Sequence, residues 1–560
     1  MEALDWLVIG VFFLALIGII VWVVRQKQND SADYFLGGRD ATWLAIGASI
    51  FASNIGSEHL IGLAGAGASS GMAMAHWEIQ GWMILILGWV FVPFYTRSMV
   101  YTMPEFLERR YNPQSRTILS VISLVSYVLT KVAVTVYAGG LVFQQVFGIK
   151  ELWGIDFFWI AAIGLVVLTA LYTIFGGMKS VLYTSVLQTP ILLLGSLIIL
   201  VLGFKELGGW DEMMRVCGAV TVNDYGDTMT NLIRSNDDAN FPWLGALIGS
   251  AIIGFWYWCT DQFIVQRVLS GKNEMEARRG TIFGAYLKLL PVFLFLIPGM
   301  IAFALHQKYI GAGGEGFLPM LANGTANADA AFPTLVAKLL PAGVKGLVVC
   351  GILAALMSSL ASLFNSSAML FTIDFYKRFR PETPEKKLVG IGQVATVVIV
   401  ILGILWIPIM RSVGDVLYTY LQDVQSVLAP GIAAAFLLGI CWKRTSAQGG
   451  MWGLIAGMVI GLTRLGAKVY YSNAGEVADS TFKYLFYDMN WLFFCGWMFL
   501  FCIIVVIVVS LATKAPTAEK IQGLVFGTAT KEQKAATRAS WNHWDIIHTV
   551  IILALSLIHI

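Results

Sequence analysis

Long apolar segments follow one another along the whole chain, separated by shorter polar stretches. A helix needs roughly 20 predominantly apolar residues to cross a bilayer, and about fourteen segments reach or approach that length. They cover residues 3–24, 42–67, 73–98, 118–147, 157–174, 183–202, 242–263, 282–305, 344–371, 388–410, 416–439, 451–469, 491–511 and 546–560. The pattern predicts an all-α membrane protein with about fourteen transmembrane helices.

Charged residues make up only 13% of the chain, and the basic ones gather in alternate loops. The basic loops lie near residues 25–39, 97–116, 267–279, 377–387, 443–444 and 514–538. Cytoplasmic loops carry the excess of Lys and Arg, so we expect these loops to face the cytoplasm. Both termini and the acidic loop 203–240 then face outward, and the plasma membrane is the expected location.

Polar residues interrupt the second apolar segment in its middle. Asn54, Gly56, Glu58 and His59 follow one another where a helix should be apolar. Such residues are costly at membrane depth, which indicates a helix broken for binding a ligand. The segment 242–263 has a comparable interruption at Thr260-Asp261-Gln262. An ion-coupled transporter is the function that this pattern favours.

The matching positions of the two breaks predict inverted repeats, as many transporters have. We expect an extra helix and linker at 1–41, a first repeat of five helices at 42–202, a second at 242–439 and accessory helices at 440–560. The chain has no GxxxxGK[ST] phosphate loop, no metal spacing among its six cysteines and no nucleophile–base set. An enzyme, an ATP-driven pump and a nucleic-acid partner are therefore not expected, and nothing indicates an oligomeric state.

Several sequence strings occur in the order that one family shows. They are Ala-Ser-Asn-Ile-Gly-Ser (52–57), Thr-Met-Pro-Glu-Phe-Leu (102–107), Ala-Leu-Tyr-Thr-Ile-Phe-Gly-Gly (170–177), Trp-Tyr-Trp-Cys-Thr-Asp-Gln (256–262), Ser-Ser-Leu-Ala-Ser-Leu-Phe-Asn-Ser (358–366) and Pro-Gly-Ile-Ala-Ala-Ala-Phe-Leu-Leu (430–438). With them the chain resembles the sodium/glucose cotransporters of the solute:sodium symporter superfamily over nearly its whole length. The resemblance implies a LeuT-type fold with discontinuous first helices, alternating access and sodium-driven uptake of a small solute.

The resemblance also implies a sodium site between the first break and a facing helix. Its ligands are the carbonyls of Ala52, Ile55 and Ala355 and the hydroxyls of Ser358 and Ser359. Neutral oxygens suit a hard cation, and an unwound turn releases carbonyls. The alternative is that the paired serines only allow close helix packing.

Some family members have a second sodium site, which uses an aspartate after Tyr-Thr and a threonine beyond the paired serines. This chain has Ser185 and Ala361 at those positions. Both differences remove oxygen or charge, so we expect one sodium ion per solute.

The family's sugar-binding positions correspond to seven residues of this chain. They are Asn54, His59, Glu78, Tyr257, Trp258, Lys288 and Gln422. Glu78 accepts from sugar hydroxyls, Lys288 donates, and Tyr257 lies against the ring and gates the inward path. Lys131 is a further candidate for this pocket.

Each assignment has a plainer alternative. Glu78 and Lys288 can be a structural ion pair, because intramembrane charges usually pair. Tyr257 and Trp258 can be packing aromatics, and Gln422 can simply lie near the end of a span. Asp261 is expected to pair with Arg267 or another basic group.

The substrate prediction is glucose or galactose. Histidine at position 59 matches animal-type glucose carriers, whereas similar bacterial galactose carriers have glutamine there. Another polyol such as myo-inositol remains an alternative, as does a sugar sensor or sodium leak channel on the same scaffold. Glu78 disfavours an acidic substrate such as sialic acid.

Overall fold

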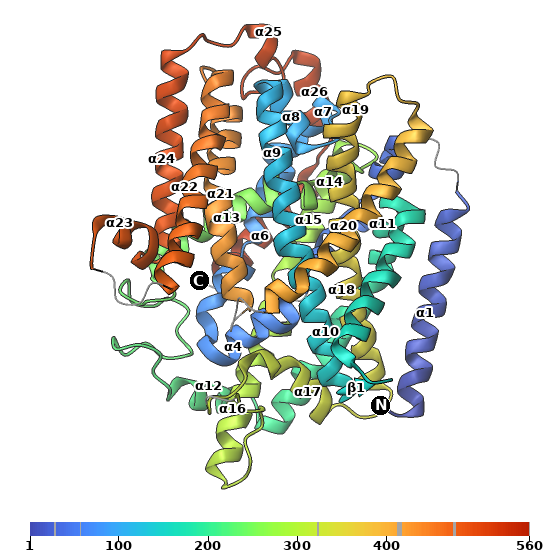
Figure 1. Cartoon of the computed structure of the whole chain (residues 1–560), viewed down its shortest axis with the longest axis vertical. Coiled ribbons are helices and arrows are strands. Elements are labelled where there is room, and N and C mark those ends of the chain that lie inside the picture. The colour runs from blue at the N-terminus through green and yellow to red at the C-terminus, as the bar shows by residue number, and fades with distance from the viewer. Residues whose placement is uncertain (27–29, 57, 322–323, 412–416, 474–477, 559–560) are drawn as a thin grey trace.

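A computed structural model describes residues 1–26, 30–56, 58–321, 324–411, 417–473 and 478–558. Side chains are described for these residues except 129–130, 409–411, 417–423, 473 and 558. The chain forms one bundle of long helices, with α1 (Ala3–Val24) at one edge and α22 (Ala447–Asn473) and α24 (Trp491–Ala512) at the other (Figure 1).

The first half of the described chain contains the following further elements. They are α2 (Ser31–Leu36), η1 (Gly37–Arg39), α3 (Trp43–Asn54), η2 (Glu58–Leu63), α4 (Ala64–Ser70), η3 (Gly71–Met74), α5 (Ala75–Glu78), α6 (Gly81–Ile86), η4 (Leu87–Phe91), α7 (Val92–Ser98), α8 (Met103–Arg110), α9 (Pro113–Ser126), η5 (Tyr127–Val132), α10 (Ala133–Phe147), the antiparallel hairpin β1 (Glu151–Leu152) and β2 (Ile155–Asp156), α11 (Phe157–Leu207) and α12 (Trp210–Gly218).

The second half begins after the loop that follows α12. Its elements are α13 (Trp243–Gly254), η6 (Phe255–Thr260), α14 (Gln262–Leu269), α15 (Glu274–Lys288), η7 (Val292–Leu296), α16 (Ile297–Gly311), η8 (Ala328–Ala330), α17 (Ala331–Leu339), α18 (Val344–Met369), η9 (Leu370–Tyr376), α19 (Lys377–Phe379), α20 (Glu385–Arg411), α21 (Leu417–Cys441), α23 (Thr481–Lys483), η10 (Tyr484–Asp488), α25 (Ala518–Ile521), α26 (Lys531–Ala539) and α27 (His543–Ile558).

Ten helices in the described residues are long and apolar enough to cross a membrane. Two of them, Glu58–Ser98 and Phe157–Leu207, cover segments that the sequence analysis divides. Three apolar helices are shorter: Trp43–Asn54, Ala133–Phe147 and His543–Leu557. Within the described residues, each of the expected segments coincides with helix, so the all-α membrane architecture is confirmed.

Gly177 bends the long helix α11 between two of the expected spans. Its backbone has φ 54° and ψ −149°, a conformation that favours glycine. A Cβ at this position would collide with the backbone carbonyl of Tyr34. The bend therefore requires glycine and lets the second half of α11 run along α18.

The core of the bundle is formed where α3 lies between α15, α11 and α18. Short π-helical segments interrupt several helices here, and η2, η5 and η6 carry His59, Lys131 and Tyr257. Such segments are frequent at functional sites because they shift the register of the side chains that follow. α21 also lies against η2 and η6, so it closes the same region from another side.

Candidate functional site

The first break follows the last turn of α3. The helix ends at Asn54, and Ile55 leaves it with φ −79° and ψ 101°. The amides of His59 and Leu60 both donate to the carbonyl of Gly56. The last four carbonyls of a helix have no partner within it, and that of Ala52 is one of these four. The break therefore offers backbone oxygens in the middle of the bundle, as the sequence predicts.

The second break lies at Asp261, between η6 and α14. Asp261 has φ −77° and ψ 126°, and its carboxylate caps α14 by accepting from the amide of Phe263. Both discontinuous first helices that the sequence predicts are therefore present.

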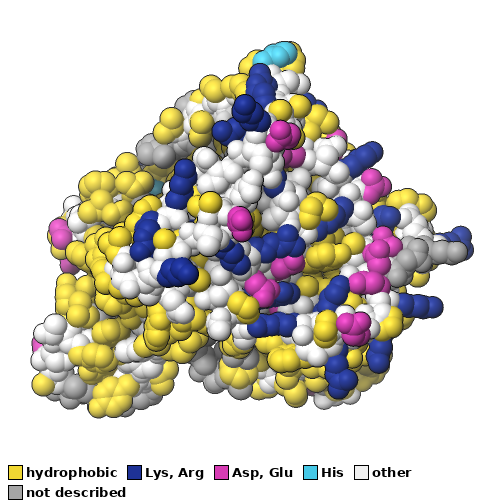
Figure 2. Space-filling view, turned by 90° about the horizontal axis from the view of Figure 1, so that it is seen from above, with side chains coloured by type: hydrophobic (Ala, Val, Ile, Leu, Met, Phe, Trp, Pro, Cys, Tyr) yellow, Lys and Arg dark blue, Asp and Glu magenta, His cyan; other side chains and the backbone are white. Residues whose placement is uncertain are grey.

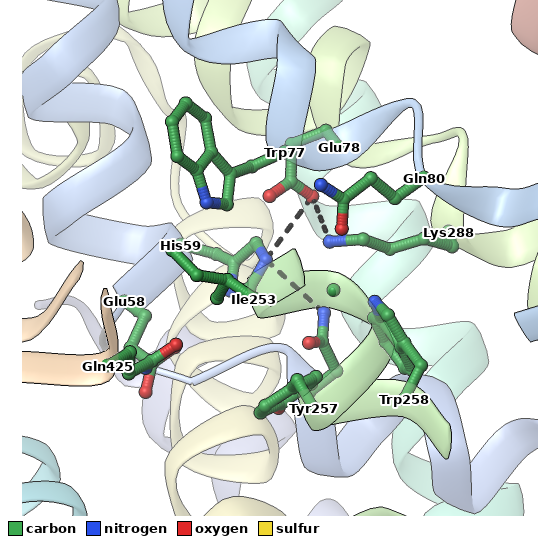
Figure 3. Close-up of a pocket in the computed structure, with 12 residues that line it drawn as sticks. Glu58, His59, Trp77, Glu78, Gln80, Ile253, Tyr257, Trp258, Lys288 and Gln425 are labelled. Carbon is green, nitrogen blue, oxygen red and sulfur yellow. Dashed lines mark hydrogen bonds and ion pairs between the residues drawn. The ribbon is translucent and has the colours of Figure 1, made fainter. Parts of the chain in front are cut away.

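A polar cavity lies beside the two breaks (Figure 3). Its volume is about 40 Å³, and it is lined by Asn54, Glu58, His59, Trp77, Glu78, Gln80, Ile253, Gly254, Tyr257, Trp258, Lys288 and Gln425. Six of the seven predicted sugar residues are among them. The seventh, Gln422, has its side chain outside the described part of the chain. Lys131 is not among the lining residues.

Glu78 is the centre of a buried hydrogen-bonded network in this cavity. Its Oε2 lies 2.6 Å from Nζ of Lys288 and 3.3 Å from Nε2 of His59. The same Nε2 lies 3.3 Å from Nδ2 of Asn54. A ring nitrogen cannot donate to Glu78 and accept from Asn54 at once, so one of these contacts is always unsatisfied.

Two polar atoms of the cavity lining have no hydrogen-bond partner among the described residues. They are Nδ1 of His59 and Nε1 of Trp77, and both are buried. Both contacts to Glu78 end on Oε2, which leaves Oε1 outside the ion pairs (Figure 3). Buried polar groups are nearly always paired. An unpaired indole donor, an imidazole nitrogen and a carboxylate oxygen together suit a neutral ligand that both donates and accepts.

The cavity in this structure holds no more than one or two water molecules. Small-molecule pockets usually measure about 300–1,000 Å³, so a cavity of about 40 Å³ is too small for a ligand of that size. The side chains bond to one another where a ligand's hydroxyls would otherwise lie. Binding must therefore open this cavity and replace internal hydrogen bonds by bonds to the ligand.

Four residues of the lining that carry polar side-chain atoms were not predicted as ligands. They are Glu58, Trp77, Gln80 and Gln425. Glu58 comes from η2 and Gln425 from α21, two elements that pack against each other, and both side chains line the cavity (Figure 3). Gln80 donates to the backbone carbonyl of Ser250 at 2.9 Å, which ties it to α13. The polar run at 52–59 drew attention to Glu58, but no local pattern assigned it a role.

A second buried ion pair lies next to Tyr257, outside the cavity lining. Nζ of Lys131 lies 2.6 Å from Oδ2 of Asp261 and 4.8 Å from the ring centre of Tyr257. The hydroxyl of Tyr127 donates to Oδ1 of the same aspartate. Asp261 therefore pairs with Lys131, whereas the buried guanidinium of Arg267 has no hydrogen-bond partner among the described residues. Lys131, a further candidate for the pocket, is not among the residues that line this cavity and instead contacts Tyr257, the predicted gate residue.

The helices that carry or adjoin the residues predicted for sodium, α3 and α18, pack against each other. All five are buried, and a Cβ added to Gly56 would lie 3.1 Å from Oγ of Ser359. Oγ of Ser358 lies 3.2 Å from Oγ of Ser185 on α11. The predicted ligands are Ala52, Ile55, Ala355, Ser358 and Ser359.

Further hydroxyl pairs join the same three helices. Oγ of Ser53 lies 2.7 Å from Oγ of Ser362, and Oγ of Ser185 lies 3.4 Å from Oγ of Ser49. The sequence analysis missed Ser49, Ser53 and Ser362. Their small polar side chains allow close packing and also surround the break with neutral oxygens.

Comparisons with known proteins agree with this geometry. The family model described as "Sodium:solute symporter family" matches residues 34–457. The chain is 36% identical over 542 residues to sodium/myo-inositol cotransporter 2 of Mus musculus, covering 94% of this chain and 80% of that protein. It is 35% identical to sodium/glucose cotransporter 4 of Danio rerio, covering 97% and 84%.

The fold has a solved counterpart. An outward-open, substrate-bound structure of a Na⁺-coupled sialic acid symporter aligns with a TM-score of 0.74 at 22% identity, covering 92% of this chain and 99% of that one. This likeness concerns the fold, which is of the LeuT type. The chain is not an enzyme but a multi-pass membrane transporter that couples a solute to sodium, and it belongs to the sodium:solute symporter family.

Proposed function

We propose that this protein carries a monosaccharide, glucose or galactose, into the cell together with one sodium ion. The observation that supports this most is the closed polar cavity with its buried Glu78–Lys288 pair and its unpaired donors and acceptors. A sugar presents hydroxyls that donate and accept in all directions. The ion pair balances its own charge, so it suits a neutral ligand.

Each lining residue has a role in this proposal. Glu78 accepts from one or two hydroxyls through Oε1, and Lys288 donates to a ring or hydroxyl oxygen. Asn54 and His59 bind the far side of the ring, and Trp258 lines the pocket. Gln422 belongs to α21, the helix that also carries the lining residue Gln425, and we keep it as a sugar ligand.

Sodium binding comes first in the proposed cycle. The ion lies between the carbonyls of Ala52, Ile55 and Ala355 and the hydroxyls of Ser358 and Ser359. Because Asn54 is the last residue of α3, an ion at this break fixes the amide that meets the sugar. Because the proposed ligands are neutral carbonyls and hydroxyls without a carboxylate, the site binds sodium weakly enough for the ion to leave again.

The inward step then depends on Tyr257. Its ring lies beside Lys131, which is held by Asp261. When the region around the second break opens, Tyr257 moves aside and sugar and sodium leave to the cytoplasm. We place the protein in the plasma membrane with both termini outside and keep the division into repeats at 42–202 and 242–439.

A second substrate is supported by a specific observation. Several similar relatives are named sodium/myo-inositol cotransporters. A cyclic hexol presents the same pattern of ring hydroxyls, and the carboxylate of Glu58 at the end of the cavity accepts from one more hydroxyl. An acidic substrate such as sialic acid fits less well, because its carboxylate would meet Glu58 and Glu78.

Uptake into proteoliposomes tests the proposal. We expect radiolabelled glucose to accumulate under an inward sodium gradient, and galactose to compete better than myo-inositol or sialic acid. E78Q keeps the shape of the pocket but loses a charged acceptor, so we expect glucose to bind about 10- to 100-fold more weakly. Stronger competition by myo-inositol would assign the polyol instead. A sugar-evoked current without accumulation would mean a sensor or a sodium leak channel.

A further inference from the structure

A long apolar groove lies on the outside of the bundle, away from the transport site. Its volume is about 970 Å³, and its walls come from α9 and η5, from η9 and from α20. The lining includes Leu124, Phe371, Val394, Ile399 and Leu402. Phe371, Val394 and Leu402 are exposed large apolar side chains. In the membrane this groove faces lipid.

Glycine makes the groove hollow near one end. A Cβ added to Gly390 would meet no atom within 4 Å. Along α20 the lining runs from Lys387 to Leu402, which is roughly 22 Å at 1.5 Å per residue. A hydrocarbon core is about 30 Å thick, so the groove is longer than one leaflet and suits an extended hydrocarbon chain.

One end of the groove is basic. Lys387 belongs to its lining, and a second hollow of about 560 Å³ shares Phe371 and Tyr376 with it and reaches Arg380. Among the described residues, neither Lys387 nor Arg380 has an ion-pair partner, although Lys377 close by pairs with Glu385. Lys and Arg are abundant on the face of the molecule seen from above in Figure 2, and Figure 1 shows α19 (Lys377–Phe379) at that end.

We propose that this groove binds one anionic glycerophospholipid, with an acyl chain along α20 and its phosphate between Lys387 and Arg380. Two unpaired cations at one end of a long apolar groove match a ligand with one anionic end and a hydrocarbon tail. Basic pockets between membrane helices recognise anionic head groups in this way. A helix of a partner protein is about 10 Å wide. Such a helix in the groove would leave both Lys387 and Arg380 without an anionic partner.

The groove also touches the helices that work in transport. Val128 of its lining is three residues before Lys131, which contacts the gate residue Tyr257. Phe371 lies in η9, which continues α18, the helix that carries Ser358 and Ser359. A lipid in this groove therefore contacts both helices, and we expect its occupancy to change the transport rate.

Native mass spectrometry of the full-length protein, purified and supplied with phosphatidylglycerol or phosphatidylcholine, tests the binding itself without any transport assay. We expect one phosphatidylglycerol to remain bound to the unaltered chain. In K387Q/R380Q its affinity falls about 30-fold, since each basic residue near the surface contributes about 1 kcal/mol. G390F fills the groove and abolishes retention. Two matched controls should retain phosphatidylglycerol. K514Q/K534Q removes two exposed cations elsewhere on the chain. G18F adds a ring to α1 at a position where a Cβ also meets no atom within 4 Å.

Other outcomes overturn the proposal. Equal retention of phosphatidylglycerol by G390F and G18F would place the lipid elsewhere. Retention lost in G390F but unchanged in K387Q/R380Q, or equal binding of phosphatidylcholine, would mean an apolar groove without recognition of the head group. A protein co-purifying in place of lipid and lost in G390F would identify a helix as the occupant. Because no sugar is used, the result is independent of the proposed function.

Discussion

Replacing Lys288 with methionine tests whether the ion pair in the cavity is as tightly coupled as its geometry indicates. Nζ of Lys288 lies 2.6 Å from Glu78, and the two side chains are 5% and 1% exposed. K288M keeps the length of the side chain but leaves the carboxylate of Glu78 buried with only His59 beside it. E78Q in the same chain removes the remaining charge.

The expected size follows from the cost of an unpaired buried charge. Removing one partner of a buried pair costs about 3–5 kcal/mol of the free energy of unfolding, whereas removing both charges is often nearly neutral. We therefore expect K288M to lose about 3–5 kcal/mol and K288M/E78Q to recover most of it. K308M is the matched control, because exposed Lys308 donates only to the carbonyl of Leu207, and we expect it to change stability by less than about 0.5 kcal/mol.

Thermal unfolding in detergent without sugar measures these differences. We expect a midpoint several degrees lower for K288M, and a midpoint close to that of the unaltered protein for the double variant. The reasoning is refuted if K288M/E78Q unfolds at least as early as K288M, because the loss would then come from packing and not from the unpaired charge. All variants that change Glu78 or Lys288 should still lose sugar uptake.

Three further predictions concern other parts of the molecule. G56A places a methyl group 3.1 Å from Oγ of Ser359. We expect the sodium concentration for half-maximal uptake to rise about tenfold while the Hill coefficient for sodium stays at one. A Hill coefficient near two would contradict the single sodium site. K131M removes the ion-pair partner of Asp261, so we expect it to raise the sodium current measured without sugar, whereas K131R should leave this current unchanged. Equal currents in K131M and K131R would exclude this contact from gating. Asp329 lies in η8, between α16 and α17, and burial raises its pKa from 3.8 to about 6. The folded chain thus holds this proton more tightly, and stability should fall by up to about 3 kcal/mol as pH rises from about 3 to about 7, through both pKa values. D329N should remove this pH dependence and unfold later at pH 7, and unchanged pH dependence would refute the assignment.

The order of helices and the two broken helices could be predicted from the sequence because each depends on local pattern. An apolar run long enough to cross a bilayer has few alternatives, and a run such as Asn54 to His59 within it cannot remain a regular helix exposed to lipid. The family resemblance then supplied six predicted sugar residues that the structure brings together in one cavity. These features required no knowledge of distant contacts.

The remaining site residues depend on packing between distant segments. Lys131 and Asp261 are 130 residues apart, and Lys131 lies in the π-helical segment η5, where side chains depart from the usual helical spacing. Periodicity therefore could not show that Lys131 points to Asp261 rather than into the sugar pocket. Trp77 in α5 and Gln80 in the turn after it reach the cavity from one segment, and Gln425 reaches it from α21, far along the chain. Their polar atoms carry no local signal of that placement.

Equilibrium binding measured in both directions tests the coupling between the sodium site and the cavity most directly. Glucose affinity is measured without and with saturating sodium, and sodium affinity without and with saturating glucose, on the purified protein. The proposed sodium site at the first break adjoins Asn54, the proposed sugar ligand, so each ligand should tighten the binding of the other by the same factor, about 5- to 150-fold. Glucose binding that is equally strong with and without sodium would contradict the account.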